Sequence, residues 1–168
     1  MSLNIVSDQA GDPRWKLLSA AQDRLARAES LDHVIAIVRS SARAICSADG
    51  VTFVLRDGDR CHYVEEDAVG PLWKGQKFPM TTCISGWAML NGKTAVIEDV
   101  FADARIPHDV YRKTFVKSLI MTPIGRDTAV AAIGAYWRDR CEFAEHEVAA
   151  IVALAASVGN AMKSAPAA

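Results

Sequence analysis

The spacing of apolar residues changes from a helical to a strand-like period and back again, and this order constrains the fold more than any other feature. Apolar residues recur at helical spacing from Trp15 through Leu18 to Leu25. A second helix is predicted to begin after Ser30, a suitable N-cap, and a last helix is predicted over residues 144–162. Helices at both ends of a strand-rich middle predict an α+β fold.

The middle of the chain predicts antiparallel strands joined by turns and short helical segments. Residues 51–55 are β-branched and aromatic, and the turn signal Asp57-Gly58 separates them from a returning strand at 61–64. Further strands are predicted at 94–97, 118–124 and 129–137, with an irregular segment at 70–82. A short helix is predicted at 84–90, ended by Asn91-Gly92, and a helical turn near 109–114.

Length and charge place the chain among single-domain proteins without affinity for nucleic acid. Its 168 residues suit one domain, predicted at 14–163, between a flexible leader at 1–13 and a flexible tail at 164–168. Lys and Arg number 19 against 20 Asp and Glu, so no basic excess attracts a phosphate backbone. No apolar run approaches the ~20 residues that span a bilayer, and no basic secretory leader is visible. We therefore expect no membrane contact, a cytoplasmic location and reduced cysteines.

Several motifs, in this order and spacing, resemble those of a known family. They are Cys83-Ile84-Ser85-Gly86-Trp87-Ala88, Ala95-Val96-Ile97-Glu98-Asp99-Val100, Asp103-Ala104-Arg105, Ser118-Leu119-Ile120-Met121-Thr122-Pro123-Ile124 and Gly134-Ala135-Tyr136-Trp137. Together they resemble the GAF domains of bacterial sensor histidine kinases and phytochrome-related receptors. The resemblance implies a central antiparallel sheet of five or six strands. It also implies terminal helices on one face, and short helices and loops over a small-molecule pocket on the other.

The resemblance suggests which side chains lie near that pocket. Pockets are mostly apolar with a few polar groups, and ten residues of both kinds fall in the appropriate segments. The predicted ligand-binding residues are Phe53, Cys83, Trp87, Phe101, Arg105, His108, Tyr111, Phe115, Ser118 and Met121. The alternative is that these aromatic residues fill a collapsed core.

Particular ligands of the family are harder to place on this sequence. Covalent bilin attachment is not expected, because Pro107 stands before His108 where the attaching cysteine would be, and Cys61-His62 lies on the early hairpin. The Asn-Lys-x-Phe-Asp-Glu-like run of cyclic-nucleotide binders does not occur. Cys61, His62, Cys141 and His146 match no compact zinc pattern, so no metal is expected.

These observations predict a non-enzymatic sensory module that binds an unidentified small molecule. The wide apolar arc of the last helix predicts a homodimer through the terminal helices, with an output kinase domain as a candidate partner. One alternative is a thiol-based reductase, because some members of the GAF family that this sequence resembles reduce free methionine sulfoxide with pocket cysteines. Residues 100–115 lack the second cysteine that this chemistry needs near Cys83. Another alternative is a dimerisation scaffold without a ligand.

Overall fold

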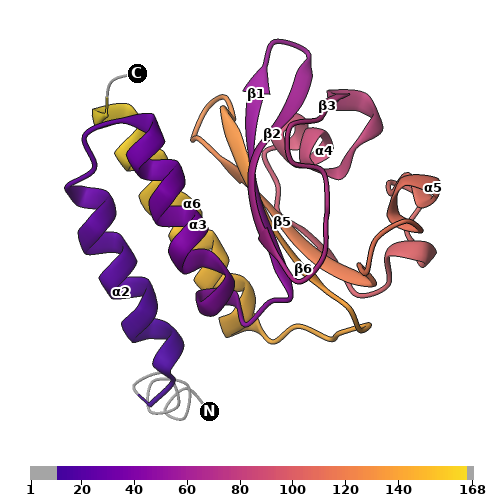
Figure 1. The fold of residues 1–168 in the computed structure, drawn as a ribbon, viewed down its shortest axis with the longest axis horizontal. Helices are drawn as coiled ribbons and strands as arrows, with labels where there is room; N and C mark the ends of the chain where they lie inside the picture. Colours follow the sequence, from indigo (N-terminus) through magenta and orange to yellow (C-terminus); the bar gives the residue numbers. More distant parts are fainter. Residues whose placement is uncertain (1–10, 166–168) are drawn as a thin grey trace.

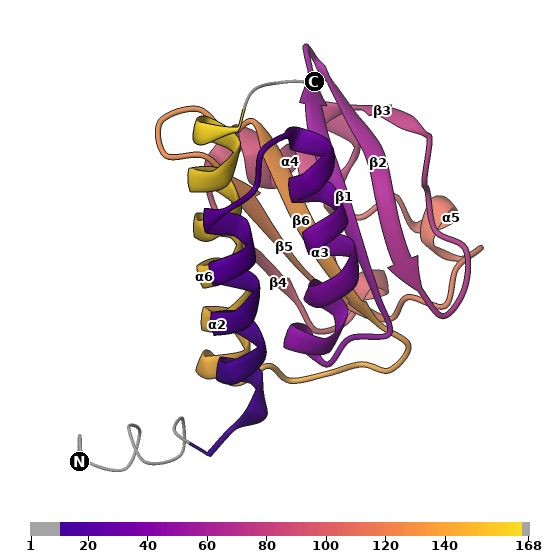
Figure 2. The same ribbon diagram turned by 60° about the vertical axis from the view of Figure 1, so that its left-hand side comes forward.

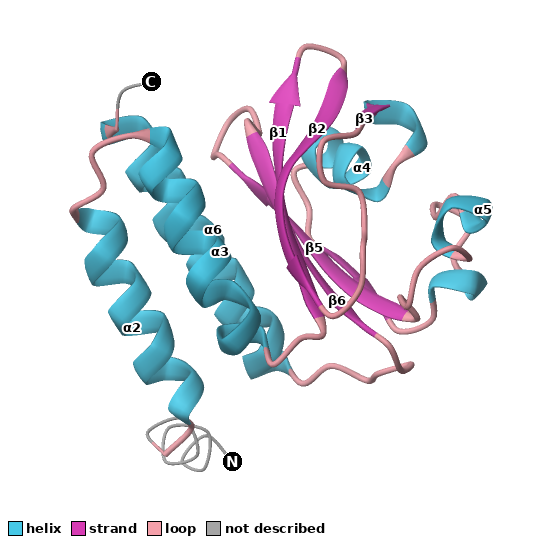
Figure 3. Ribbon diagram, in the orientation of Figure 1, coloured by secondary structure: helices cyan, strands magenta, loops and turns pink. Residues whose placement is uncertain are grey.

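The computed structural model describes residues 11–165, which form a layered α+β structure (Figures 1 and 3). The predictions for residues 1–10 and 166–168 lie outside the described residues. The long helices are α2 (Pro13–Ala26), α3 (Leu31–Cys46) and α6 (Glu145–Ser164); the short ones are α4 (Ile84–Asn91), α5 (His108–Tyr111) and the 3-10 turns η1 (Met80–Thr82) and η2 (Val100–Ala102). The strands are β1 (Gly50–Asp57), β2 (Arg60–Ala68), β3 (Lys77–Pro79), β4 (Ala95–Ile97), β5 (Ser118–Ile124) and β6 (Ala131–Trp137).

All the strands join one sheet, which confirms the predicted fold class. The order is β3-β2-β1-β6-β5-β4, and each neighbouring pair is antiparallel. The predicted hairpin forms from β1 and β2, with an irregular register between Phe53 and Val54. Because successive side chains of a strand point to opposite faces, the sheet separates two cores.

Local capping explains where the first two helices begin. The Asp12 side chain accepts a hydrogen bond from the Arg14 amide, and Pro13 occupies the first turn, where its missing N–H costs nothing. Helix α2 therefore begins inside the segment expected to be a leader. The Ser30 hydroxyl accepts a hydrogen bond from the His33 amide at 3.1 Å, so Ser30 is the N-cap of α3, as predicted.

The three long helices form two layers rather than one. Helices α3 and α6 lie on the sheet, and α2 packs on the outer side of both (Figures 1 and 2). Leu18, Ala21 and Leu25 of α2 are buried in this contact. Part of the apolar arc of α6 is therefore covered by α2 within the same chain. No helix among residues 11–165 combines the length and apolar character needed to cross a bilayer.

Cys46 lies in the helix-side core and provides a test of its packing at alkaline pH. Burial raises the pKa of the Cys46 thiol from 9.0 to about 12, against a smaller opposing effect of Arg14. The unfolded chain loses this proton above pH 9, while the folded chain keeps it. The contribution of the buried thiol to the free energy of unfolding is therefore fully present below pH 9 and is lost as the pH rises to 12.

We expect this thiol alone to lower the free energy of unfolding by up to about 4 kcal/mol between pH 9 and 12, at about 1.4 kcal/mol per pH unit. Urea denaturation at a series of pH values measures this slope. In Cys46→Ala the decline should be correspondingly shallower. Identical pH profiles for the two proteins would contradict the burial of an un-ionised thiol here.

Candidate ligand pocket

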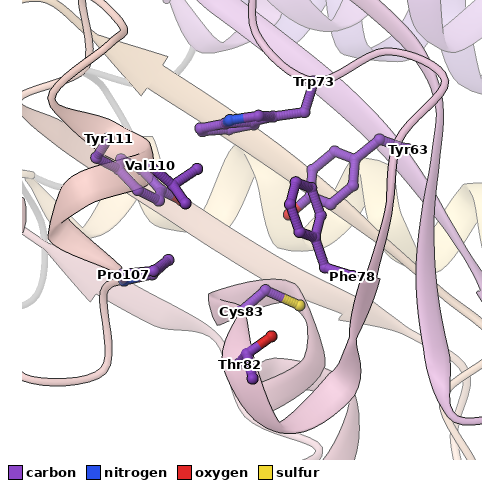
Figure 4. Close-up of a pocket in the computed structure, with 8 residues that line it drawn as sticks. All are labelled: Tyr63, Trp73, Phe78, Thr82, Cys83, Pro107, Val110 and Tyr111. Atoms are coloured by element: carbon purple, nitrogen blue, oxygen red, sulfur yellow. The ribbon is translucent and has the colours of Figure 1, made fainter.

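A cavity of about 150 Å³ lies on the sheet face opposite the long helices (Figure 4). It is bounded by β2, the segment leading into β3, the turn η1, the start of α4, and α5. The lining residues are Tyr63, Trp73, Phe78, Thr82, Cys83, Pro107, Val110 and Tyr111. The wall contains no Asp, Glu, Lys, Arg or His side chain. The cavity therefore suits an uncharged occupant, because a buried charge without a partner is strongly disfavoured.

Aromatic rings form most of the wall. The Trp73 ring lies 4.8 Å from the Tyr111 ring and 5.6 Å from the Tyr63 ring, measured between centroids. Phe78 meets Tyr63 edge to face at 5.6 Å. In Figure 4, Tyr63 and Phe78 face Tyr111 and Val110 across the cavity, and Trp73 bridges them. Such offset and edge-on contacts hold the rings in place.

The tyrosine hydroxyl groups of the wall stay neutral, and the hydroxyls of Tyr63 and Thr82 are hydrogen-bonded within the protein. The Tyr63 hydroxyl lies 2.9 Å from the Ser85 hydroxyl, and the Thr82 hydroxyl donates to the Pro79 carbonyl at 3.0 Å. Burial raises the pKa of Tyr63 and of Tyr111 well above the usual range. These groups can donate or accept hydrogen bonds to a ligand but do not carry charge at neutral pH.

One carboxylate holds the segment that carries Trp73. The side chain of Glu66 on β2 accepts hydrogen bonds from the backbone amides of Leu72 at 3.0 Å, Trp73 at 2.9 Å and Lys74 at 2.7 Å. Hydrogen bonds to a charged acceptor are shorter and stronger than neutral ones. The loop before β3 is thereby held against the sheet, and Trp73 is directed to the cavity.

Two thiols meet at the edge of the cavity. Cys83 precedes α4 as its N-cap, and its Sγ lies 3.2 Å from the Sγ of Cys61 on β2; neither is in a disulfide. The hydrogen bond with Cys61 lowers the pKa of Cys83, aided by the Ser85 hydroxyl and the nearby Gly86 amide, against the opposing effect of burial. The same hydrogen bond, together with burial, raises the pKa of Cys61.

Of the ten predicted ligand-binding residues, the structure brings Cys83 and Tyr111 together at this cavity. Phe53 belongs to the helix-side core, on the other face of the sheet, because it is Val54 that points to the pocket face. Met121 is fully buried within the pocket-side core, and Phe115 packs at its margin. These three residues therefore do not line the cavity.

The remaining predicted residues form contacts outside the cavity. Arg105 stacks 4.3 Å from the Trp87 ring and pairs with Asp103 at 2.7 Å, which lowers the pKa of that carboxyl. The His108 ring nitrogen Nε2 lies 2.9 Å from the Asp103 carbonyl oxygen, and its ring packs 5.7 Å from that of Phe101.

Ser118, the last of the ten, donates to the Asp139 carbonyl at 2.7 Å and is fully buried. Its hydroxyl therefore links the start of β5 to the segment after β6. Within residues 11–165, no group of three or more His, Cys, Asp or Glu side chains is placed to hold a metal ion.

Sequence reasoning missed most of the cavity wall. The omitted residues are Tyr63, Trp73, Phe78, Thr82, Pro107 and Val110. Tyr63 alternates along β2 with the half-exposed His62, so strand alternation could have placed it on one face. Trp73 lies in a Gly-Pro segment with no periodicity, and no local signal indicates that Glu66 directs it inward.

A six-stranded antiparallel sheet, with long helices on one face and a partly open cavity among short segments on the other, defines a class of α+β pocket domains. The family model described as GAF domain matches residues 28–163. The chain therefore belongs to the GAF domain family. No curated protein matches the sequence.

Solved structures of several kinds share this fold. The GAF domain of an Acinetobacter phosphoenolpyruvate-protein phosphotransferase is 13% identical, with a TM-score of 0.77 and coverage of 91% of this chain and 94% of that one. Free methionine-R-sulfoxide reductase from Neisseria meningitidis is 18% identical, with a TM-score of 0.75 and coverage of 90% of this chain and 89% of that one. The phycocyanobilin-bound GAF domain of a cyanobacterial phytochrome is also 18% identical, with a TM-score of 0.73 and coverage of 90% of this chain and 94% of that one. At these identities the likeness shows the fold alone.

Proposed function

We propose that this chain is a sensory module that acts in the cytoplasm and binds a small, uncharged molecule in the aromatic cavity. The observation that carries the proposal is the aromatic wall of Tyr63, Trp73, Phe78 and Tyr111 around a partly open cavity. Pockets with apolar walls and a few fixed polar groups are the usual sites of small ligands. The phycocyanobilin-bound GAF domain of a cyanobacterial phytochrome, which shares this fold, provides a precedent for a small molecule bound by such a domain.

The size of the cavity narrows the class of ligand. Drug-sized ligands occupy pockets of roughly 300–1,000 Å³, whereas this one measures about 150 Å³. A dry apolar cavity of about 150 Å³ accepts a molecule such as benzene. Single-ring molecules therefore fit, while a tetrapyrrole or a cyclic nucleotide needs a wider opening. Pro107 in the wall also offers no nucleophile for covalent attachment of a bilin.

A titration with phenol tests the proposal. Its ring fits the aromatic wall, and its hydroxyl matches the tyrosine and threonine hydroxyls. We expect ligand-observed NMR to show one site with Kd on the order of 0.1–1 mM, a reasonable value for a molecule of this size. The variant Val110→Trp places an indole in the cavity and should weaken binding at least about tenfold, because the volume is occupied.

Val130→Trp is the matched control, since Val130 is 45% exposed and lies outside the cavity wall. It should bind phenol as the wild type does. Absence of saturable binding to the wild type, or equal binding to both variants, would favour the ligand-free scaffold instead.

Signal transmission is proposed to pass through the long helices of a homodimer to an output domain such as a kinase. Ala149, Val152 and Ala156 form an exposed stripe on α6, and Leu17 on α2 is 43% exposed. A ligand can act on this assembly only if it prefers one helix arrangement to another. Sedimentation velocity should show a dimer that Val152→Asp shifts towards monomer. A monomeric wild type would remove this part of the proposal.

The reductase alternative has weaker support. Free methionine sulfoxide carries an ammonium and a carboxylate, and the cavity wall contains no Asp, Glu, Lys, Arg or His to pair with either. Cys83 does have a thiol neighbour, but it is Cys61 on β2 rather than a cysteine in residues 100–115. The rate at which the wild type and Cys83→Ser reduce free methionine sulfoxide decides between a reductase and a sensory module. Equal, negligible rates exclude the enzyme.

A further inference from the structure

The contact between Cys61 and Cys83 joins two segments that are separate in sequence and in secondary structure. Cys61 lies on β2 and is fully buried. Cys83 precedes α4, is 8% exposed and lines the cavity. The Sγ–Sγ distance is 3.2 Å. A disulfide bond is about 2.05 Å long, so bond formation requires an approach of roughly 1 Å.

The surroundings give the two thiols unequal roles. The Ser85 hydroxyl donates to the Cys83 sulfur at 3.4 Å and lies 2.9 Å from the Tyr63 hydroxyl, which forms a short chain of hydrogen bonds ending at Cys83. Cys83 also lies at the positive end of α4, which favours a thiolate. Cys61 faces Cys83 but does not line the cavity. Cys83 is thus the sulfur that a molecule in the cavity meets first.

We propose that Cys61 and Cys83 form a redox pair that a small hydroperoxide oxidises to a disulfide through the cavity. The inference goes beyond reversible ligand binding, because it requires only that a small solute reach Cys83. The apolar wall and the volume of about 150 Å³ admit hydrogen peroxide or a short alkyl hydroperoxide. They exclude large charged disulfides such as oxidised glutathione.

The reaction balances in two steps. The Cys83 thiolate attacks the outer oxygen of the hydroperoxide and the O–O bond breaks. The departing alkoxide, or hydroxide when the oxidant is hydrogen peroxide, takes the proton that the Cys83 thiol gave up and leaves as an alcohol or as water. Cys83 is then a sulfenic acid. The Cys61 sulfur attacks the Cys83 sulfur, the S–O bond breaks, and the hydroxyl leaves as water with the Cys61 proton. The two thiols lose two electrons, and the hydroperoxide gains them.

Thiol counting on the full chain tests the proposal. Reduced protein is exposed to hydrogen peroxide, denatured, alkylated and analysed by intact mass and peptide mapping. Of the four cysteines, two should become resistant to alkylation, linked as Cys61–Cys83. Oxidation of Cys83 should be at least about tenfold faster than that of Cys141, which is more accessible but lies outside the cavity. A different linkage, or Cys83 reacting no faster than Cys141, overturns the proposal.

Variants separate the two steps. Cys61→Ala should accumulate a sulfenic acid on Cys83 that dimedone traps, while Cys83→Ser should abolish fast oxidation of Cys61. Cys141→Ser is the control and should form the same disulfide at the wild-type rate. Because the mapping uses wild-type protein, it decides the question even if a variant fails to fold.

Phenol titration of the same reduced protein distinguishes the two proposals. Phenol binding without the disulfide overturns the redox pair alone. The disulfide without phenol binding overturns the proposed ligand-binding function alone.

Discussion

Gly86→Ala is expected to lower the melting temperature by about 10 °C, the largest effect of any methyl-sized change that we predict. A Cβ added at Gly86 would lie 1.9 Å from the Met80 carbonyl oxygen and 2.6 Å from the Met80 Cα. Both atoms belong to the backbone, so η1 and α4 must move apart to accommodate the methyl group. Overpacking of this kind costs about 3 kcal/mol, and 1 kcal/mol corresponds to roughly 2–4 °C in a domain of this size.

Gly70→Ala is the matched control. A Cβ there meets only the Phe115 ring, at an ordinary contact distance of 3.5 Å. Differential scanning calorimetry should therefore show a melting temperature close to that of the wild type. Similar melting temperatures for Gly86→Ala and Gly70→Ala would mean that the close approach of α4 to η1 is absent. The same displacement should also loosen Cys83, which lies between these two elements.

Trp73→Ala is the second change with a large expected effect, and its damage should be repairable. Trp73 is 5% exposed and touches the rings of Tyr63, Tyr111 and Tyr136. Removing a buried tryptophan costs about 3–5 kcal/mol, through lost contacts and the space left behind. That space has the shape of an indole and joins the existing cavity. We expect free indole to restore part of the lost stability, because it binds the folded state only.

The measurement is the urea midpoint of Trp73→Ala with and without millimolar indole. Trp137→Ala serves as the comparison, since Trp137 packs against Phe143 and donates to the Ser47 carbonyl, away from the cavity. Indole should raise the midpoint of Trp73→Ala and leave that of Trp137→Ala unchanged. Equal responses would show that indole acts elsewhere on the protein.

The fold could be predicted because its elements carry local signals. Ser30 before an apolar helical stripe identified the start of α3, and Gly92, which has a φ of +60°, identified the end of α4. Asp57-Gly58 marked the hairpin between β1 and β2, where Gly58 adopts a φ of +61°. Each of these signals depends on a few neighbouring residues, so a single sequence is enough to read it.

The cavity could be predicted only in outline, because its wall depends on contacts between distant segments. Family resemblance placed Cys83 and Tyr111 near a pocket, as the structure has them, but it also placed Phe53 there, whereas the Phe53 side chain lies under the long helices. Trp73 reaches the cavity because Glu66, several residues earlier, binds its backbone amide.

The pairing of Cys61 with Cys83 also depends on tertiary structure. Cys61 lies on β2, and Cys83 approaches it only because β3 and η1 return the chain to that strand. Neither the spacing nor the neighbours of the two cysteines in sequence indicates the contact.

The apolar surface of α6 is another feature whose partner cannot be predicted from the sequence. Its wide apolar arc predicts a dimer seam, yet α2 of the same chain covers part of that arc. The side-chain amide of Gln22 also donates a hydrogen bond from Nε2 to the Ser157 hydroxyl at 3.1 Å, which joins α2 to α6. Amphipathic pattern alone indicates that a surface is buried and does not identify its partner.

The proposed function depends on a partly open, aromatic-walled cavity on the face of the sheet opposite the long helices. Crystals of the reduced protein pressurised with xenon test it directly, because xenon enters dry apolar cavities of this size. We expect anomalous density for one xenon atom between Trp73, Phe78 and Tyr111. An empty or collapsed space at that position, with xenon bound only in the helix-side core, would contradict it.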